Sequence, residues 1–317
     1  MKIKLVAGLA LAFAAAAAQA AYPERPIRII VPYAPGGGAD TLSRLIGQKL
    51  GESLGQPVIV ENRPGADTQL GTGAVAKAPA DGYTLGMVTP TVTINKTMYP
   101  DAPYDLERDL RAVAMVGNSP FFLVVNPGVA AKSVGELVAL AKANPDKFNY
   151  SASSSITFVT GEAFKRAAGI DVQNILYKGS APSVTAVVSG EVQYTFDTVL
   201  TTKPFIEAGR LRVLALTTPQ RLPDAPDVPT MEQAGIADFD YSSWYGLVTP
   251  SGVPDDVVRR LNEAVGRILA LPEFRQKLAD MGAVPLPMSA GEFDAVIKRD
   301  IAKYGALLKS SNMAKRN

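Results

Sequence analysis

The segment Pro35-Gly36-Gly37-Gly38-Ala39-Asp40 is the first part of the chain whose residue types could bind an anion. Three successive glycines let the backbone turn tightly and let a ligand approach without meeting a side chain. A helix that begins here would turn its unpaired N–H groups and the positive end of its dipole toward that ligand. The segment lacks the G-x-G-x-x-G spacing and the Walker lysine of nucleotide sites, and a plain flexible turn is the alternative. The candidate ligand-binding residues are Tyr33, Pro35, Gly36, Gly37, Gly38 and Asp40.

A second candidate is the hydroxyl-rich segment 151–157, which follows a short predicted strand and precedes a predicted helix. Its hydroxyls and the N–H groups of a second helix start could hold the other end of a dicarboxylate. They could equally hold the same carboxylate from across a cleft, or only cap the helix. A nucleophilic serine here would have no histidine base. The candidates are Ser153, Ser154, Ser155 and Thr157.

Four further residues end predicted strands or precede predicted helices. Thr89 and Thr91 offer hydroxyl donors, with capping of a short helix as the alternative. Lys178 could place an ammonium group near an anion, although a surface lysine in a turn is equally common. Asp197 could accept a hydrogen bond from a ligand amine or hydroxyl, or it could cap the following helix.

The composition excludes several classes of chemistry. The chain has no Cys and no His, which rules out disulfides, thiolate nucleophiles, Ser-His triads and Cys or His metal ligands. We therefore expect no cofactor, no metal and no enzymatic activity. The alternative is a periplasmic enzyme that acts on an organic acid, with Asp40, Asp197 and Lys178 as acid–base groups.

Hydrophobic patterning predicts the elements that position these residues. Residues 25–33 read as a buried strand, because Ile and Val follow one another as in parallel sheets. Apolar residues at helical spacing follow the glycine turn until Gly55, and 57–61 reads as the next strand. The order strand, turn, helix, strand is a βαβ unit, so the sheet is expected to be parallel.

The same alternation continues along the chain. Ser133 with Glu136, and Ser289 with Glu292, are predicted capping boxes, and Pro254 is predicted as a first helical residue. Trp244 and Tyr245 are predicted to pack at a crossing between lobes rather than to contact ligand. Further strands are predicted at 83–89, 121–125, 172–176, 192–196 and 211–216, and further helices at 157–167 and 181–189.

Length and pattern predict two α/β lobes without a linker, so the chain should cross between them more than once and leave a cleft. We expect lobe 1 to comprise 21–122 and 248–317, and lobe 2 to comprise 123–247. The first 20 residues read as a cleavable signal peptide, with a basic start, an apolar run and Ala18-Gln19-Ala20 as the cleavage site. An uncleaved anchor is the alternative.

Charge argues against nucleic acid as a partner. The chain has 32 basic and 30 acidic side chains, and the predicted signal contains Lys2 and Lys4 but no acid. The remaining chain therefore has 30 of each and no net charge. A neutral chain without a polybasic run is not expected to bind nucleic acid or anionic lipid. We expect a periplasmic monomer.

A series of short segments has an order and spacing that are specific together. They are Tyr22-Pro23 with Pro26-Ile27-Arg28, and the segments 31–37, 60–66, 81–85, 177–179, 226–230 and 244–247. In these segments the chain resembles the Bug family of periplasmic binding proteins, the receptors of tripartite tricarboxylate transporters. The resemblance covers nearly the whole chain.

The resemblance implies a type II periplasmic-binding-protein (Venus flytrap) fold, with a mainly parallel sheet flanked by helices in each lobe. It implies a small carboxylate as ligand: an organic acid, a dicarboxylate, an aromatic acid or an acidic amino acid. It also implies that backbone amides and water near 34–40 hold one carboxylate. The implied role is uptake or sensing, with the membrane subunits of such a transporter or a sensor as partners.

Two segments depart from the family pattern. Where the family has a glycine-rich stretch, this chain has Asp67-Thr68-Gln69. Where the family has a Ser-x-Gly-x-Gly-Thr loop followed by His, this chain has 151–157 and then Phe158-Val159-Thr160. Asp67 is therefore a further candidate, which either favours a ligand with an amine or points to solvent.

Overall fold

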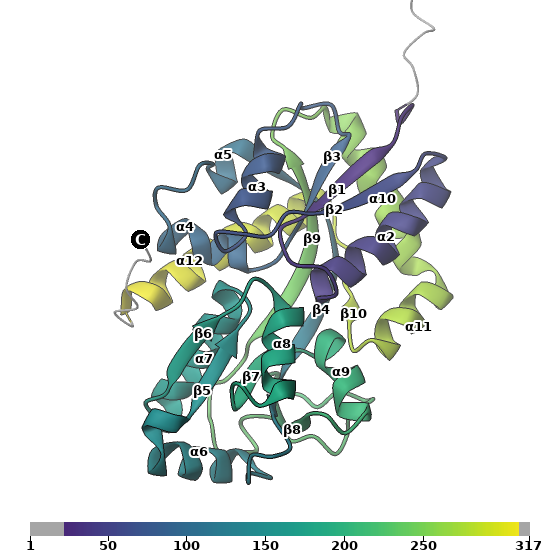
Figure 1. Ribbon diagram of the computed structural model, residues 1–317. Coiled ribbons are helices and arrows are strands. Elements are labelled where there is room, and N and C mark those ends of the chain that lie inside the picture. Colours follow the sequence, from purple (N-terminus) through teal and green to yellow (C-terminus); the bar gives the residue numbers. More distant parts are fainter. Residues whose placement is uncertain (1–21, 311–317) are drawn as a thin grey trace, which may run out of the picture.

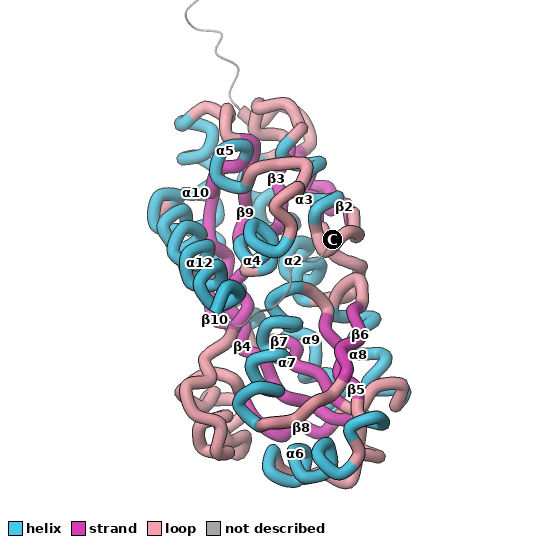
Figure 2. Tube along the Cα trace, turned by 90° about the vertical axis from the view of Figure 1, so that its left-hand side faces the viewer, coloured by secondary structure: helices cyan, strands magenta, loops and turns pink. Residues whose placement is uncertain are grey.

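A computed structural model of the chain describes residues 22–310, so the predicted signal peptide lies outside the described residues. The described part forms two α/β lobes, with the long strand β4 (Leu110–Val125) running from one into the other (Figure 1). Figure 2 shows the two lobes from the side, with β4 at the waist between them. We call residues 22–120 and 242–310 lobe 1, and residues 121–241 lobe 2.

The sheet of lobe 1 has a parallel core and an antiparallel extension. Its strands are β1 (Ile27–Val31), β2 (Val58–Asn62), β3 (Thr84–Val88), β9 (Ser242–Pro250), β10 (Val284–Pro285) and the first part of β4. Strand β1 lies between β2 and β3 and is parallel to both. Strand β9 is antiparallel to β3 and to β4. The predicted βαβ unit is therefore confirmed, within a mixed sheet.

Helices cover this sheet (Figures 1 and 2). They are α2 (Gly38–Leu54), α3 (Gln69–Ala76), α4 (Thr91–Met98), α5 (Leu106–Asp109), α10 (Asp255–Ala270), α11 (Pro272–Asp280) and α12 (Ala290–Ser310). Helix α2 packs Leu42, Ile46 and Leu50 into the core beside the buried isoleucines of β1. It ends at Gly55, which adopts a left-handed conformation with φ 74° that glycine accepts without strain.

Lobe 2 repeats the plan. Its strands are β5 (Asn149–Ala152), β6 (Gln173–Leu176), β7 (Tyr194–Thr198), β8 (Arg212–Leu216) and the last part of β4. Strand β5 lies between β6 and β7 and is parallel to both, whereas β7 and β8 are antiparallel to β4. Its helices are α6 (Val134–Ala143), the 3-10 turn η1 (Pro145–Lys147), α7 (Ser155–Ala168), α8 (Ser180–Ser189) and α9 (Val199–Glu207).

Strand β4 is longer than predicted. The sequence suggested a strand only at 121–125, whereas the observed strand begins at Leu110 and pairs with β9 over 110–120. Two register shifts, Gly117 and Pro120 interrupt the regular pattern of this stretch, and such features are typical of strand ends rather than strand interiors.

The crossings between the lobes also differ from the expected positions. Residues 242–247 were expected in lobe 2, but they belong to β9 and pair with β3 and the first part of β4. Trp244 packs as predicted: its ring meets Phe293 edge-on, and its N–H donates to Asp300 at 2.7 Å. The strand that returns the chain to lobe 1 is therefore part of lobe 1 from its first residue.

Of the three predicted helix starts, one is confirmed in full, one in part, and one is wrong by one residue. Ser289 and Glu292 form the complete capping box, each bonded to the backbone N–H of the other. Ser133 accepts from the Glu136 N–H, but the Glu136 carboxylate accepts from Lys132 instead of Ser133. Pro254 is the N-cap of α10 and not its first helical residue.

Candidate functional site

A small cavity, the inner chamber, lies where the two lobes meet. Lobe 1 contributes Tyr33, Gly37, Gly38, Thr89 and Tyr245, and lobe 2 contributes Ser153, Ser154, Thr157, Ser180, Asp197 and Thr198. Its volume is about 30 Å³, whereas a single water molecule needs roughly 10–15 Å³ on the same measure. The chamber therefore has room for a small functional group and not for a whole ligand.

Three helices begin at the inner chamber without a side-chain cap. Their N-caps are Gly37 for α2, Gly179 for α8 and Thr198 for α9. An uncapped helix start presents unpaired N–H groups and a partial positive charge, and both attract an anion. Because α2 belongs to lobe 1 and α8 and α9 to lobe 2, an anion in the chamber would be held from both sides.

The loop before α2 is packed closely against lobe 2. The Ala34 N–H donates to the Lys178 carbonyl oxygen across the interface at 3.2 Å. A Cβ atom on Gly38 would lie 2.6 Å from Tyr245 Oη and 2.9 Å from Leu200 Cδ2. Glycine at position 38 is therefore required by the close packing of the α2 start against both Tyr245 of lobe 1 and Leu200 of lobe 2.

Asp40 holds the same loop from behind. Its carboxylate accepts from the Gly36 N–H at 2.9 Å, from the Asn62 amide at 2.9 Å and from the Arg44 guanidinium. Burial alone would raise the pKa of Asp40, but the bonds from Arg44, Gly36 and Asn62 outweigh it and hold the pKa below its ordinary value. Asp40 thus fixes the loop that carries the candidate amides.

Asp197 brings a buried carboxylate to the inner chamber from the end of β7. The side chain has no exposed surface, and Oδ1 accepts from the Thr198 N–H at 2.8 Å. Oδ2 makes no hydrogen bond with any residue of the described range. Burial is the largest influence on this carboxyl and raises the pKa of Asp197 to about 6. The chamber therefore contains a carboxyl oxygen with unused hydrogen-bonding capacity.

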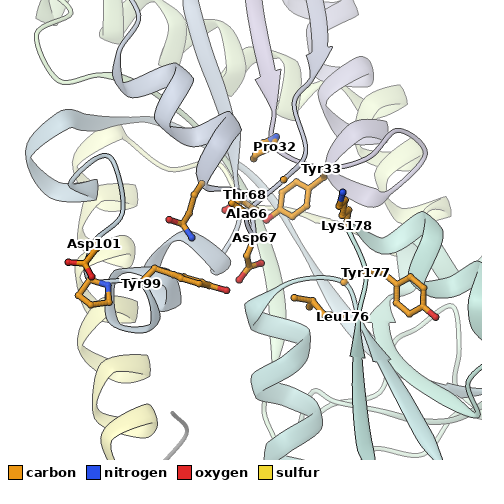
Figure 3. Close-up of a pocket in the computed structure, with 14 residues that line it drawn as sticks. Pro32, Tyr33, Ala66, Asp67, Thr68, Tyr99, Asp101, Leu176, Tyr177 and Lys178 are labelled. Atoms are coloured by element: carbon orange, nitrogen blue, oxygen red, sulfur yellow. The ribbon is translucent and has the colours of Figure 1, made fainter. Parts of the chain in front are cut away.

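A larger cavity, the outer cleft, opens next to the inner chamber (Figure 3). Its volume is about 710 Å³, and Tyr33 and Ser153 line both cavities. Its other walls include Asp67, Tyr99 and Asp101 from lobe 1 and Leu176, Tyr177 and Lys178 from lobe 2. A ligand could therefore place one end in the inner chamber and its remainder in the outer cleft.

Helix α7 differs from the three uncapped helices, because side chains bond to the backbone N–H groups around its start. Thr157 Oγ1 accepts from the N–H groups of Ser153 and Ser154, at 2.8 and 3.1 Å. Ser154 and Thr157 also form a capping box. The alternative of simple capping, left open for this segment from the sequence, accounts for these two side chains.

Asp67 supplies the remaining contact at the start of α7. The Ser155 N–H donates to Asp67 Oδ1 at 3.2 Å, and the Ser155 hydroxyl bonds to Asp67 Oδ2. Asn95 of α4 joins this group, because its Oδ1 lies 2.6 Å from the Ser155 hydroxyl and its amide donates to the Asp67 carbonyl at 2.6 Å. Asp67 therefore points to lobe 2, where its carboxylate meets a helix start, and not to solvent (Figure 3).

The turn that holds Asp67 has an unusual backbone. Ala66, Asp67 and Thr68 have φ values of 46°, 47° and 75°. The left-handed region costs a non-glycine residue on the order of 1–2 kcal/mol, and a β-branched residue such as Thr68 is rarely found there. Such strain persists only where the surroundings impose it, which is typical of functional positions.

The remaining candidates lie around the two cavities. Tyr33 Oη and Thr89 Oγ1 are bonded at 2.6 Å in the wall of the inner chamber, and Thr91 is buried at the start of α4. Lys178 is exposed, and its side chain lines the outer cleft while its carbonyl meets Ala34. Pro35 and Gly36 lie exposed in the loop. The structure thus places most of the candidates along one path between the lobes.

Sequence reasoning missed several residues of these cavities. Tyr245, expected only to pack, also lines the inner chamber, as do Ser180 and Thr198. Ser180 and Thr198 directly follow the motifs that contain Lys178 and Asp197, so their position at a helix start was the available signal. Tyr99 and Asp101 of the outer cleft lie in an irregular stretch that carried no recognisable pattern.

Two further features of the described residues bear on the class of protein. Within residues 22–310, no helix combines the length and the apolar character that crossing a membrane requires. The same residues bring together no group of three or more acidic side chains that could hold a metal ion.

A family model and several known proteins match this chain. The model described as the tripartite tricarboxylate transporter family receptor matches residues 42–313. The protein BugT of Bordetella pertussis is 33% identical over 317 residues, which are 98% of this chain and 97% of BugT.

Solved structures match at high similarity. A structure described as that of a periplasmic transporter superposes with a TM-score of 0.90 at 37% identity, over 93% of this chain and 100% of that chain. Rpa4515 of R. palustris, solved with adipate, gives 0.89 at 32% identity, over 92% and 98%. MatC of Rhodopseudomonas palustris, with bound malate, gives 0.86 at 28% identity, over 90% and 100%.

Proposed function

The chain belongs to the tripartite tricarboxylate transporter receptor family, and on this basis we propose that it captures a small carboxylate between its two lobes for uptake or sensing. The resemblance drawn from its motifs is confirmed, and so is the two-lobed fold. Members of this family are solute-binding receptors, and the proteins whose solved structures match include one described as a periplasmic transporter and the periplasmic binding protein BugD. Two of those proteins were solved with the carboxylates adipate and malate.

One observation carries the proposal: three uncapped helix starts from both lobes converge on a chamber of the size of one functional group. In the proposal, a ligand carboxylate enters the inner chamber and accepts hydrogen bonds from both lobes. The donors are the backbone amides of Gly37 and Gly38 in lobe 1 and Ser180 at the start of α8 in lobe 2. The remainder of the ligand lies in the outer cleft, between Tyr33 and Lys178. Asp40 acts indirectly, by holding the loop.

The proposal extends to compartment and partners. The N-terminal segment would direct export to the periplasm, where the protein would work as a monomer without nucleic acid. The membrane subunits of a tripartite transporter, or a sensor, would receive the loaded form. The lobes would move as the bodies 22–120 with 242–310, and 121–241.

We also propose that the protein does no chemistry on its ligand. The side chains considered for acid–base catalysis are spread over three places. Asp197 lines the inner chamber, Lys178 lines the outer cleft, and Asp40 is bonded to Arg44, Asn62 and the Gly36 N–H. A general acid and base must both reach one reacting group, which this separation disfavours.

A thermal unfolding screen with a panel of carboxylates tests the proposal. A ligand at a hundredfold its Kd should stabilise the protein by about 2.7 kcal/mol, and calorimetric titration should give one site per chain. Native mass spectrometry of the purified protein checks for a small acid already bound, and recovery of that acid unchanged checks the absence of chemistry. No stabilisation by any carboxylate would contradict the proposal.

A further inference from the structure

Asp67 places a carboxylate of the protein itself at the start of α7, on the far side of the cleft. The Ser155 N–H donates to Oδ1 at 3.2 Å, and the Ser155 hydroxyl bonds to Oδ2. Asn95 is bonded to both partners, which fixes the turn of lobe 1 against the helix of lobe 2. The contact therefore bridges the lobes at the edge of the outer cleft (Figure 3).

This contact brings an acidic side chain of the protein to the start of α7, next to residues that line the inner chamber. A helix start is a favourable place for an anion because of its N–H groups and its dipole. At α7 the N–H groups of Ser153 and Ser154 donate to Thr157, and that of Ser155 donates to Asp67. The start of α7 thus has side-chain partners from the protein, whereas α2, α8 and α9 begin without side-chain caps at the inner chamber.

The outer cleft would also disfavour a second negative charge. Its charged lining residues are Asp67 and Asp101 against Lys178, and the other walls include Tyr99 and Leu176. A ligand that leaves the inner chamber past Tyr33 and Ser153 enters this space. A second ligand carboxylate in this cleft would lie close to the negative charge of Asp67. Because like charges repel, this would lower the affinity for a dicarboxylate.

We propose that Asp67 is a specificity-determining residue that makes this receptor prefer monocarboxylates with an uncharged, mainly apolar remainder over dicarboxylates. The inference rests on the proposed function, because it assumes that a first carboxylate enters the inner chamber. It separates this chain from the relatives solved with adipate and malate, which are both dicarboxylates.

Matched ligand pairs test the inference by calorimetric titration. Hexanoate with adipate, butyrate with succinate, and benzoate with terephthalate differ only by the second carboxylate. The unchanged protein should bind the monocarboxylate of a pair at least about tenfold more tightly. Asp67→Gly, whose backbone suits the left-handed turn, should cut this preference at least about tenfold, mainly by improving affinity for the dicarboxylate.

Two further variants isolate the cause. Asp67→Asn keeps the shape of the side chain and removes its charge, so it should shift the preference in the same direction by a smaller factor. Asp171→Asn removes one charge from a fully exposed side chain that follows the C-terminal end of α7, opposite to the end that meets Asp67, and should leave the preference unchanged. Unfolding curves confirm that each variant is folded.

Each outcome decides one of the two ideas. A dicarboxylate preference in the unchanged protein, or an unchanged preference in Asp67→Gly, overturns the inference and leaves carboxylate binding intact. An equal shift in Asp171→Asn also overturns it, since overall charge would then be the cause. Failure of every carboxylate to bind any folded variant contradicts the proposed function itself.

Discussion

The two lobes contain equivalent loops that treat their helix starts in opposite ways. The loop 34–37 follows the central parallel strand β1 of lobe 1, and Ser153 and Ser154 follow the central parallel strand β5 of lobe 2. The carboxyl ends of such strands are where open α/β sheets bind ligands. In lobe 1 the start of α2 has no side-chain cap, whereas in lobe 2 the start of α7 is capped by Thr157 and bonded to Asp67.

The difference shows that residue type decides whether a helix start after a central strand is available to a ligand or is capped by the protein itself. Glycine brings no polar side chain, so the N–H groups of α2 remain for a ligand. Serine and threonine bring acceptors that satisfy the N–H groups of their own helix. A hydroxyl-rich helix start is therefore a weaker sign of a ligand site than a glycine-rich one, and four substitutions can break or sharpen that contrast.

The largest effect is expected at the uncapped start of α2, from Gly38→Ala. The new Cβ would lie 2.6 Å from Tyr245 Oη in lobe 1 and 2.9 Å from Leu200 Cδ2 in lobe 2, so the second contact would oppose the approach of the lobes. Overpacking costs about 1–3 kcal/mol, so affinity for the best carboxylate should fall about ten- to a hundredfold by calorimetry.

Gly37→Ala is the matched control, because its Cβ would meet Ser180 Cβ at an ordinary 3.4 Å. Affinity in this variant should change by less than about threefold, within 1 kcal/mol. Equal losses in the two variants would show that the site does not depend on the close approach at Gly38.

Asp197→Asn tests the buried carboxyl group that lines the inner chamber. Its pKa of about 6 lies above the ordinary 3.8, so the folded protein takes up this proton before the unfolded chain does. The cost of the buried charge is therefore present above pH 6 and disappears as the pH falls toward 4. The variant should be more stable than the unchanged protein by about 1–2 kcal/mol at pH 7, and equally stable near pH 4.

Urea unfolding of both proteins at several pH values measures this difference, in which the titration of other groups cancels. A difference in stability that stays constant from pH 4 to pH 7 would contradict the prediction.

Thr157→Val tests the capped start of α7. The substitution keeps the shape of the side chain but removes the acceptor of the Ser153 and Ser154 N–H groups, which are buried. Buried donors left without a partner cost about 1–2 kcal/mol of unfolding free energy. Thr160→Val is the matched control in the same helix, since its hydroxyl only donates to the Ile156 carbonyl, and it should cost less. Similar losses in the two variants would argue against a special role for Thr157.

The smallest effect is expected in the turn that holds Asp67. Ala66→Gly should stabilise the protein by about 0.5–1 kcal/mol, because glycine accepts the left-handed φ of 46° without strain. Ala270→Gly, at the end of α10, should instead destabilise by a similar amount. Thermal unfolding measures both, and a loss of stability in Ala66→Gly would mean that the turn is not strained.

The sequence predicted the uncapped start of α2 more fully than the capped start of α7. The β-branched run at Ile27–Val31, the glycines and the stop at Gly55 are local signals, and they identify β1, α2 and the loop between them. The capping role of Thr157 was also visible as an alternative. Local signals suffice when a feature is built from one continuous segment.

The parts that escaped prediction depend on distant segments. Asp67 meets Ser155, which is 88 residues away, and Tyr245 reaches the inner chamber through a strand that returns from lobe 2. Lys178 was singled out for its ammonium group, but its carbonyl oxygen makes the contact with Ala34. Spacing along the chain carries no information on such pairings, because they arise only when the lobes come together.

The continuous strand β4 gives the molecule a particular mechanical character. Pro120 pairs with Ser242 in lobe 1, and the next residue, Phe121, pairs with Thr198 in lobe 2, so the ladder changes partners at a single peptide bond. Proline has no N–H to lose from the ladder when it is twisted. We expect β4 to twist most easily at this bond. The lobes could then rotate relative to each other about the strand while its hydrogen bonds stay intact.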